Sequence, residues 1–162
     1  MGDVVREARL ADLPAICALG QVVNLLHHEA WPQIFAGPSE PRRDEAHWRL
    51  SIAADSATTF VVERSGELVA FATVAVIDES LSLLQPLRYA KVGSVCVAEP
   101  LRGQGIGKQL MAQAEQWACA RGAVDLRLNV WAFNEAALRF YTELGYEVRS
   151  QFLGKLLPRN AV

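Results

Sequence analysis

Residues 93–110 read GSVCVAEPLRGQGIGKQL, which describes a strand, a short turn and the glycine-rich beginning of a helix. The valines of the first half are typical of strands, and Pro100 ends the strand because it cannot donate a backbone hydrogen bond. The beginning of a helix has unpaired backbone N–H groups and a partial positive charge, so it attracts anions. Glycines let a large anion approach the backbone closely. Together with Arg102 and Lys108, this stretch predicts a binding site for a diphosphate.

The composition is that of one folded domain, which we expect to span residues 1–162. Hydrophobic residues make up 51% and charged residues 21%, and the net charge of −2 gives no support for nucleic-acid binding. Cys17, Cys96 and Cys119 form no C-x-x-C pair or Cys/His cluster, which indicates neither a metal site nor a disulfide framework. We therefore expect buried, reduced thiols in a cytoplasmic protein. No apolar run approaches the length we expect of a membrane span, so no membrane partner is predicted.

Hydrophobic spacing and turn residues predict the secondary structure along the chain. Strands are expected over residues 4–9, 58–63, 68–77, 88–97, 124–130, 146–148 and 151–157, and helices over residues 13–28, from 44 or 45 to 53, 103–121 and 134–144. Three consecutive strands with short links favour an antiparallel meander, and two strands joined by a helix favour a parallel βαβ unit. The predicted fold class is α+β, with a mixed, mostly antiparallel sheet flanked by helices and a central βαβ unit carrying the glycine turn.

Two common anion-binding motifs fit the glycine turn poorly. A P-loop requires Ser or Thr after its lysine, whereas Lys108 is followed by Gln109. A dinucleotide fingerprint requires a glycine where Lys108 stands and an acidic residue at the end of the next strand, whereas Asp125 lies at the beginning of that strand.

A third motif fits better. The run Arg102-Gly103-Gln104-Gly105-Ile106-Gly107-Lys108, after a Val-x-Val strand and a proline, resembles the coenzyme A signature of the GNAT N-acetyltransferase superfamily. The helix that follows Asn134 carries Tyr141 and ends in Gly145-Tyr146, which is similar to the family's second signature. The order of the predicted elements also agrees with this family over nearly the whole chain.

The resemblance implies that acetyl-CoA is bound as acetyl donor, without a metal. Its pyrophosphate would contact Arg102, Gly103, Gln104, Gly105, Ile106, Gly107 and Lys108, mostly through backbone N–H groups. Its pantetheine arm would pair with the backbone of Val95, Cys96 and Val97. Asn134 matches a position that commonly contacts the cofactor, although the need for a helix N-cap explains this residue equally well.

The resemblance also implies a catalytic role for Tyr141, which would protonate the departing thiolate after the amine attacks the thioester directly in a ternary complex. A backbone N–H near Val95 would hydrogen-bond the oxyanion. Several relatives carry a carboxylate base on the strand before the glycine turn, where this chain has Gly93-Ser94. A base acting through water is left open among four residues, which are His28, Glu29, Glu63 and Glu99.

The acceptor is expected to be a primary amine on a small molecule or a protein. The irregular segment of residues 29–43 is aromatic and proline-rich, so it either lines an acceptor pocket or caps the core. His28, Glu29 and Phe35 are the candidate acceptor-site residues. Acidic residues of this region (Glu29, Glu40, Asp44 and Glu45) favour a cationic acceptor, although the region also carries Arg42 and Arg43. A non-catalytic acyl-CoA-binding or interaction module is the alternative function, and a homodimer is left open because many members of the family pair.

Overall fold

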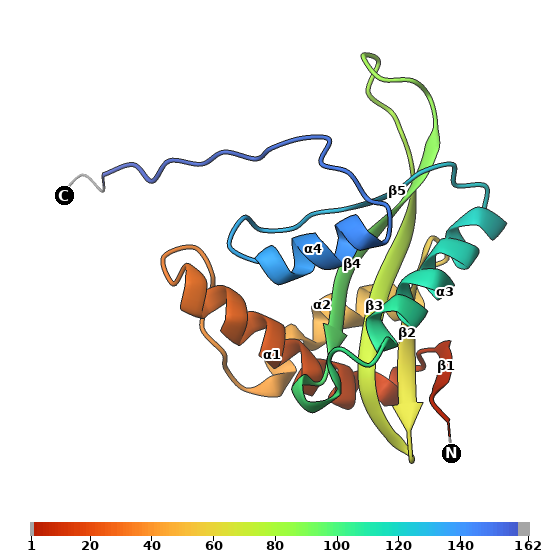
Figure 1. Cartoon of the computed structure of the whole chain (residues 1–162), viewed down its shortest axis with the longest axis vertical. Helices are drawn as coiled ribbons and strands as arrows, with labels where there is room; N and C mark the ends of the chain where they lie inside the picture. Colours follow the sequence, from red (N-terminus) through yellow and green to blue (C-terminus); the bar gives the residue numbers. More distant parts are fainter. Residues whose placement is uncertain (1, 159–162) are drawn as a thin grey trace. The chain divides into compact units, whose positions relative to one another are not determined.

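The computed structural model describes residues 2–158. The chain divides into two compact units, one up to Asn129 and one from Val130 onward. In chain order (Figure 1), the elements are β1 (Val4–Glu7), η1 (Leu10–Asp12), α1 (Leu13–Ala30), η2 (Pro41–Asp44), α2 (Glu45–Ala53), β2 (Ala57–Arg64), β3 (Glu67–Asp78), β4 (Arg88–Val97), η3 (Glu99–Leu101), α3 (Ile106–Ala120), β5 (Leu126–Leu128) and α4 (Glu135–Glu143). The prediction of one domain over residues 1–162 stays a prediction.

The first unit contains a five-stranded sheet with the order β1-β2-β3-β4-β5. The first four strands are antiparallel neighbours, and β5 pairs in parallel with β4. Because α3 connects β4 to β5, the predicted meander and the predicted βαβ unit are both present. The fifth strand is shorter than expected, since it covers Leu126–Leu128 rather than residues 124–130.

Both faces of this sheet are covered by helices. On one face, residues of α1 and α2 pack against alternate residues of the strands, and the cluster consists of Leu13, Ile16, Cys17, Trp48, Val61, Phe71 and Cys96. The next residues along each strand point to the opposite face. There α3, with Ile106, Leu110 and Met111 fully buried, contacts β2, β3 and β4. The sheet therefore holds the end of β4 and the beginning of α3 in a fixed relation.

The helical segment Leu10–Ala30 is long and apolar enough to cross a membrane, by length and composition alone. The expectation that no apolar run approaches this length is therefore wrong. Core helices pass the same test, and Leu13, Ile16 and Cys17 of this segment are buried in the core described above. The segment is thus weak evidence for a membrane span.

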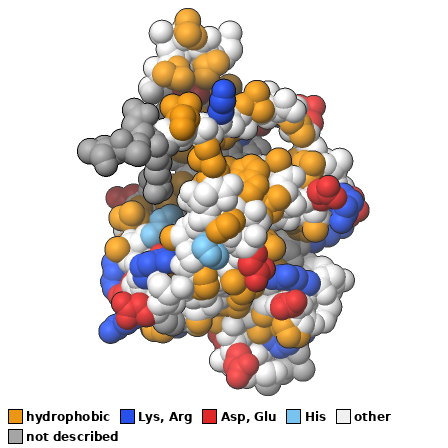
Figure 2. All heavy atoms as spheres, turned by 90° about the vertical axis from the view of Figure 1, so that its left-hand side faces the viewer, with side chains coloured by type: hydrophobic (Ala, Val, Ile, Leu, Met, Phe, Trp, Pro, Cys, Tyr) orange, Lys and Arg blue, Asp and Glu red, His pale blue; other side chains and the backbone are white. Residues whose placement is uncertain are grey.

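The loop between β3 and β4 ends in an apolar tip. Leu81, Leu83 and Leu84 are all exposed there, and Figure 2 shows hydrophobic side chains at the corresponding upper end of the view. At the base of the loop, the Asp78 carboxylate accepts a hydrogen bond of 2.8 Å from Arg88 Nε. Residues 80–87 themselves carry no charge.

Among its described residues, the second unit contains one helix, α4. Asn134 is the N-cap of α4, as predicted, and its side-chain oxygen accepts a hydrogen bond of 3.1 Å from Ala137 N. The predicted strands over residues 146–148 and 151–157 are wrong, because the described part of the chain contains no strand after α4. A strand requires a neighbouring edge for its backbone hydrogen bonds, and residues 147–158 have none among the described residues.

Candidate functional site

The glycine turn lies between β4 and α3, and two of its glycines adopt left-handed backbone conformations. Gly103 has φ +76° and Gly105 has φ +83°. A Cβ atom at either position would meet no protein atom within 4 Å. Glycine is therefore required here by the backbone conformation, and the space beside it is open. These two residues also delay the helix, which begins at Ile106 rather than near Gly103 as predicted.

The first turn of α3 presents unpaired backbone donors. Its N-cap is Gly105, which has no side chain to cap it, and the first intrahelical hydrogen bond runs from Gln109 N to Gly105 O over 3.1 Å. The N–H groups of Ile106, Gly107 and Lys108 consequently have no partner within the helix. Fifteen residues of aligned peptide dipoles lie behind them. This geometry fits an anion such as a pyrophosphate.

Two side chains of the turn tie it to the sheet. Arg102 Nε donates a hydrogen bond of 3.2 Å to Val97 O, the last carbonyl of β4. Gln104 Oε1 accepts one of 3.1 Å from Arg64, whose Nε also pairs with Asp3 at 2.6 Å. The side chain of Lys108 is exposed. Of the three polar side chains in the predicted cofactor-binding turn, those of Arg102 and Gln104 thus also hold the turn in place.

Beside the turn, β4 has a free edge. It pairs with β3 as far as Val97, but its pairing with β5 involves only Ala90, Lys91 and Val92. Within residues 2–158, residues 93–97 therefore have a neighbouring strand on one edge only, although Val97 O already accepts the hydrogen bond from Arg102. An extended ligand could add there as a strand does, which is the placement predicted for the pantetheine arm along Val95, Cys96 and Val97.

An irregularity in the ladder marks the place where β5 departs. The register between β3 and β4 shifts between Ala72 and Val74, and Ser94 N donates a hydrogen bond of 3.0 Å to Thr73 Oγ1. A Cβ atom on Gly93 would lie 2.7 Å from the same oxygen, too close for a side chain. The close approach of Thr73 therefore excludes any side chain, a carboxylate included, at position 93, whereas no contact explains the serine at position 94. A glycine inside a predicted strand was the sequence signal for this irregularity.

The three cysteines differ in exposure. Cys96 is buried under α1, where its thiol donates a hydrogen bond of 3.2 Å to Leu19 O. Burial raises the pKa of this thiol to about 11, so it stays protonated at neutral pH and is a poor nucleophile. Cys17 is also buried. The expectation of three buried thiols is wrong for Cys119, which is exposed at the end of α3.

The candidate acceptor-site residues mainly organise the loop after α1. His28 Nδ1 lies 2.9 Å from Phe35 O and donates to it, while the rings of His27 and Phe35 meet edge to face at 4.8 Å. Arg43 Nη1 donates to Gly37 O over 2.7 Å. Glu29 is exposed. These contacts give the loop a defined shape, and its aromatic residues contribute to that shape rather than standing free.

Arginines neutralise several of the acidic residues near this loop. The Asp44 carboxylate accepts hydrogen bonds from Arg43 at 2.9 Å and from Asn24 at 2.6 Å, and the bond from Arg43 lowers its pKa. Glu45 pairs with Arg49 at 2.8 Å and with Arg42. Because Asp44 and Glu45 are paired with arginines, these acidic residues favour a cationic acceptor less than the sequence alone suggested.

The four candidate bases are not brought together. Glu63 pairs with Arg6 at 3.1 Å, and His28 is engaged with the loop carbonyl. Glu99 lies on η3 directly after β4 and is exposed, as Glu29 is on α1. The choice of base therefore stays open.

The second unit holds the predicted proton donor. The ring of Tyr141 on α4 contacts the rings of Phe140 and Tyr146, with centroids 5.0 Å and 5.6 Å away. Burial raises the pKa of the Tyr141 hydroxyl to about 12, so it is protonated at neutral pH and able to donate a proton. Asn134, the other predicted site residue of this unit, is occupied as N-cap. Their roles toward the cofactor stay predictions.

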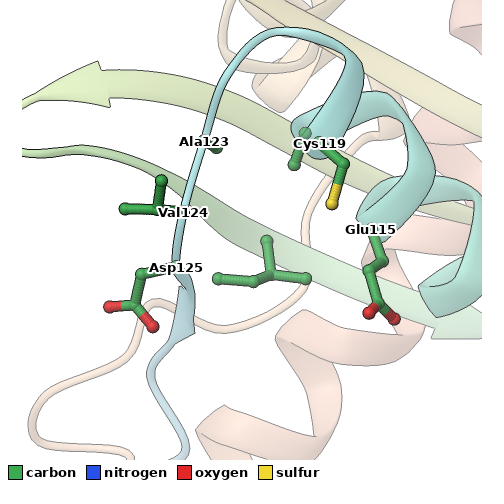
Figure 3. A pocket seen from close by; sticks show the side chains of 7 residues that line it. Glu115, Cys119, Ala123, Val124 and Asp125 are labelled. Atoms are coloured by element: carbon green, nitrogen blue, oxygen red, sulfur yellow. The ribbon is translucent and has the colours of Figure 1, made fainter.

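A small pocket of about 140 Å³ lies elsewhere in the first unit, at the end of α3 opposite to the glycine turn. Figure 3 shows Glu115 and Cys119 on the helix side and Val124 and Asp125 on the segment that leads into β5. Asp125 is paired with Arg127 Nε at 2.8 Å. Within residues 2–158, no group of three His, Cys, Asp or Glu side chains is placed to hold a metal ion.

Comparisons with known proteins place these features in context. A family model described as the acetyltransferase (GNAT) family matches residues 23–146. Over 97 residues the chain is 33% identical to an uncharacterized N-acetyltransferase, MJ1207, from Methanocaldococcus jannaschii, and the match covers 60% of this chain and 42% of the relative. The chain spans less than half the length of each of the first five curated relatives it matches.

Two solved structures establish the fold. A mutant of the BH1408 protein from Bacillus halodurans matches with a TM-score of 0.89 and 23% identity, over 96% of this chain and 99% of that chain. An aminoglycoside N-acetyltransferase in complex with CoA matches with a TM-score of 0.75 and 16% identity, over 96% of this chain and 95% of that chain. The likeness to these two proteins concerns their folds.

Proposed function

Because this chain belongs to the GNAT acetyltransferase family, we propose that it transfers the acetyl group of acetyl-CoA to a primary amine by direct attack in a ternary complex. The family and the GNAT fold confirm the resemblance and the fold class predicted from the sequence. The observation that carries the proposal is the uncapped beginning of α3 next to the free edge of β4. One feature suits a pyrophosphate, and the other suits an extended amide-containing arm leading away from it.

The donor supplies an activated thioester, and the residues of the chain position it. The N–H groups of Ile106, Gly107 and Lys108 would bind the pyrophosphate, with the positive charges of Lys108 and Arg102 nearby. The free edge of residues 93–97 would hold the pantetheine arm in line with the strand. Binding at both ends fixes the position of the carbonyl carbon, so that an amine can approach it from the open side.

Two groups would then act on the reacting atoms. As the amine nitrogen forms its bond to the carbonyl carbon, negative charge develops on the oxygen, and a backbone N–H near Val95 is proposed to donate to it. The carbon–sulfur bond breaks, and we propose that the Tyr141 hydroxyl gives its proton to the departing sulfur. The raised pKa of Tyr141 keeps that proton in place at neutral pH. The amine must lose a proton as well, to a base still to be identified.

We propose a small-molecule amine as the acceptor, with an amine on a protein as the second candidate. One of the solved structures with this fold is an aminoglycoside N-acetyltransferase in complex with CoA, and aminoglycosides are small molecules that carry amino groups. Aminoglycosides are therefore a suitable first group in an acceptor panel. The pairing of Asp44 and Glu45 with arginines means that the panel should include neutral and weakly basic amines too.

The experiment that tests the proposal follows the release of free thiol from acetyl-CoA in the presence of each amine. The exposed Cys119 would react with a thiol reagent, so the assay uses the Cys119→Ser chain. We expect turnover with at least one amine. For that amine, Tyr141→Phe should lower kcat at least tenfold while the Kd for acetyl-CoA is unchanged, because a proton donor typically contributes about 10²–10⁴-fold to the rate.

Tyr146→Phe is the matched control, because it removes a hydroxyl from the same aromatic cluster. Its kcat should stay within about twofold of the starting chain. Equal losses in the two variants would assign the effect to packing rather than to proton donation. If acetyl-CoA binds but no amine releases thiol, the chain is a non-catalytic acyl-CoA-binding module, and the proposal is wrong.

A further inference from the structure

The ladder between β3 and β4 contains an extra residue on the β4 side. Two residues of β4, Gly93 and Ser94, lie opposite Thr73 alone, because the register shifts there by one. This arrangement is a β-bulge, in which one strand carries one residue more than its partner. The bulge directly follows Val92, the last residue of β4 that pairs with β5. It therefore stands where the free edge of β4 begins.

The bulge decides which backbone groups of β4 point to the free edge. Successive residues of a strand direct their N–H and C=O groups to opposite neighbours. Before the bulge, Ala90 N donates to Asp125 O over 2.8 Å, so even-numbered residues point toward β5. After the bulge, Ala98 N donates to Val69 O over 2.9 Å, so even-numbered residues point toward β3. The bulge thus reverses the alternation, and the N–H group of Val95 points to the free edge.

The side chain of Thr73 holds both residues of the bulge. Its Oγ1 accepts a hydrogen bond of 3.0 Å from Ser94 N, so a side chain binds this N–H group of the strand. The same oxygen would lie 2.7 Å from a Cβ atom on Gly93 and therefore keeps that position free of a side chain. Thr73 is 8% exposed, which leaves its hydroxyl little room to move. The peptide unit that it holds directly precedes the one that carries the Val95 N–H.

We propose that Thr73 is a positioning residue for acetyl transfer, whose hydroxyl holds the bulge so that the Val95 N–H points at the thioester oxygen. This inference rests on the proposed function, in which a backbone N–H near Val95 donates to the oxyanion. Such a donor is effective only within a narrow range of distance and direction. The fold secures the bulge more coarsely, because Cys96 beyond it is buried under α1. A valine at position 73 would therefore keep the bulge but release the Ser94 N–H, and the Val95 N–H would no longer be held in one direction.

The first test compares two threonines that face each other across β2 and β3. Thr59 is the partner of Thr73 in the ladder and is also buried, but its Oγ1 lies 2.8 Å from Ser51 Oγ on α2. In the thiol-release assay, Thr73→Val should lower kcat at least about tenfold and leave the Kd for acetyl-CoA within about twofold. Thr73→Ser keeps the hydroxyl and should retain kcat within about threefold, and Thr59→Val should leave it within about twofold. An unchanged kcat in Thr73→Val, or an equal loss in either comparison variant, would overturn the proposal.

The second test uses NMR and needs no turnover. CoA lacks the thioester oxygen that acetyl-CoA carries, so the difference between the Val95 amide proton shifts with the two ligands reports the contact with that oxygen. In the unsubstituted chain we expect a downfield difference, which should fall at least about twofold in Thr73→Val and be retained in Thr59→Val. The amide of Ser94 should also exchange with solvent faster in Thr73→Val, because its acceptor is removed.

The two tests separate this inference from the proposed function. If no amine is acetylated but the Val95 shift difference depends on Thr73, the proposed function is wrong, and Thr73 still positions the N–H group against a bound thioester. If amines are acetylated but the shift difference is the same in Thr73→Val as in the unsubstituted chain, the inference is wrong and the proposed function stands. The absence of any shift difference in the unsubstituted chain would overturn the inference too, because the Val95 N–H would then not contact the thioester oxygen.

Discussion

Substitution of Gly105 provides the sharpest test of the anion site, because its conformational cost can be separated from its effect on binding. Gly105 has φ +83° and ψ 0°, and an added Cβ would touch no protein atom within 4 Å. Gly105→Ala should therefore cost only the strain of a left-handed alanine, about 1–2 kcal/mol of unfolding free energy. For a chain of this length that corresponds to a fall in Tm of about 2–8 °C.

Gly66 offers a matched control in the turn between β2 and β3. It has φ +82° and is equally free of neighbours within 4 Å, but it lies outside the glycine turn. In thermal unfolding, Gly66→Ala and Gly105→Ala should therefore lower the Tm by similar amounts. In isothermal titration calorimetry, only Gly105→Ala should lose affinity for acetyl-CoA, by at least tenfold, or about 1.4 kcal/mol. Equal affinities in the two variants would show that the turn does not hold the pyrophosphate.

Three further predictions follow from the structure. Only Cys119 should react with a thiol reagent in the folded chain, and Cys119→Ser should abolish the reaction; a second reactive thiol would contradict the burial described above. Gly93→Ala should lower the unfolding free energy by about 1–3 kcal/mol, because its Cβ would lie 2.7 Å from Thr73 Oγ1, and urea unfolding combined with Thr73→Ala should reveal non-additive losses. The raised pKa of Tyr141 favours the protonated phenol in the folded chain, so its contribution to stability is complete below pH 10 and is lost as the pH rises toward 12. Urea unfolding between pH 9 and 12 should show this loss, and Tyr141→Phe should remove it.

Local sequence patterns predicted most of the first unit. The hydrophobic spacing of α1 and α3 and the short links of the meander are local signals, and the structure confirms them. The glycine pattern likewise indicated an anion site, because the conformation of Gly103 and Gly105 depends on their own backbones. It could not place the helix start, since the same glycines that open the site also exclude residues 103–105 from the helix.

Features that depend on contacts between residues far apart in the sequence could not be predicted from it. The hydrogen bond between Asp44 and Asn24 depends on how the loop after α1 folds back, and no spacing rule indicates it. Residues 151–157 were predicted as a strand from their residue pattern, but whether such a segment pairs is decided by a strand edge elsewhere in the fold. The requirement for glycine at position 93 likewise becomes visible only once Thr73 is placed beside it.

The free edge of β4 also bears on the lifetime of the protein. Within the described residues, the backbone groups of residues 93–97 on that side have no partner strand, and of these groups Val97 O accepts a hydrogen bond from Arg102. A bound donor that supplies the missing hydrogen bonds stabilises the folded state by about 2.7 kcal/mol when its concentration is a hundred times its Kd. We therefore expect acetyl-CoA to slow proteolysis of the chain in proportion to its occupancy, so that the supply of a metabolite governs how long each molecule of the protein persists.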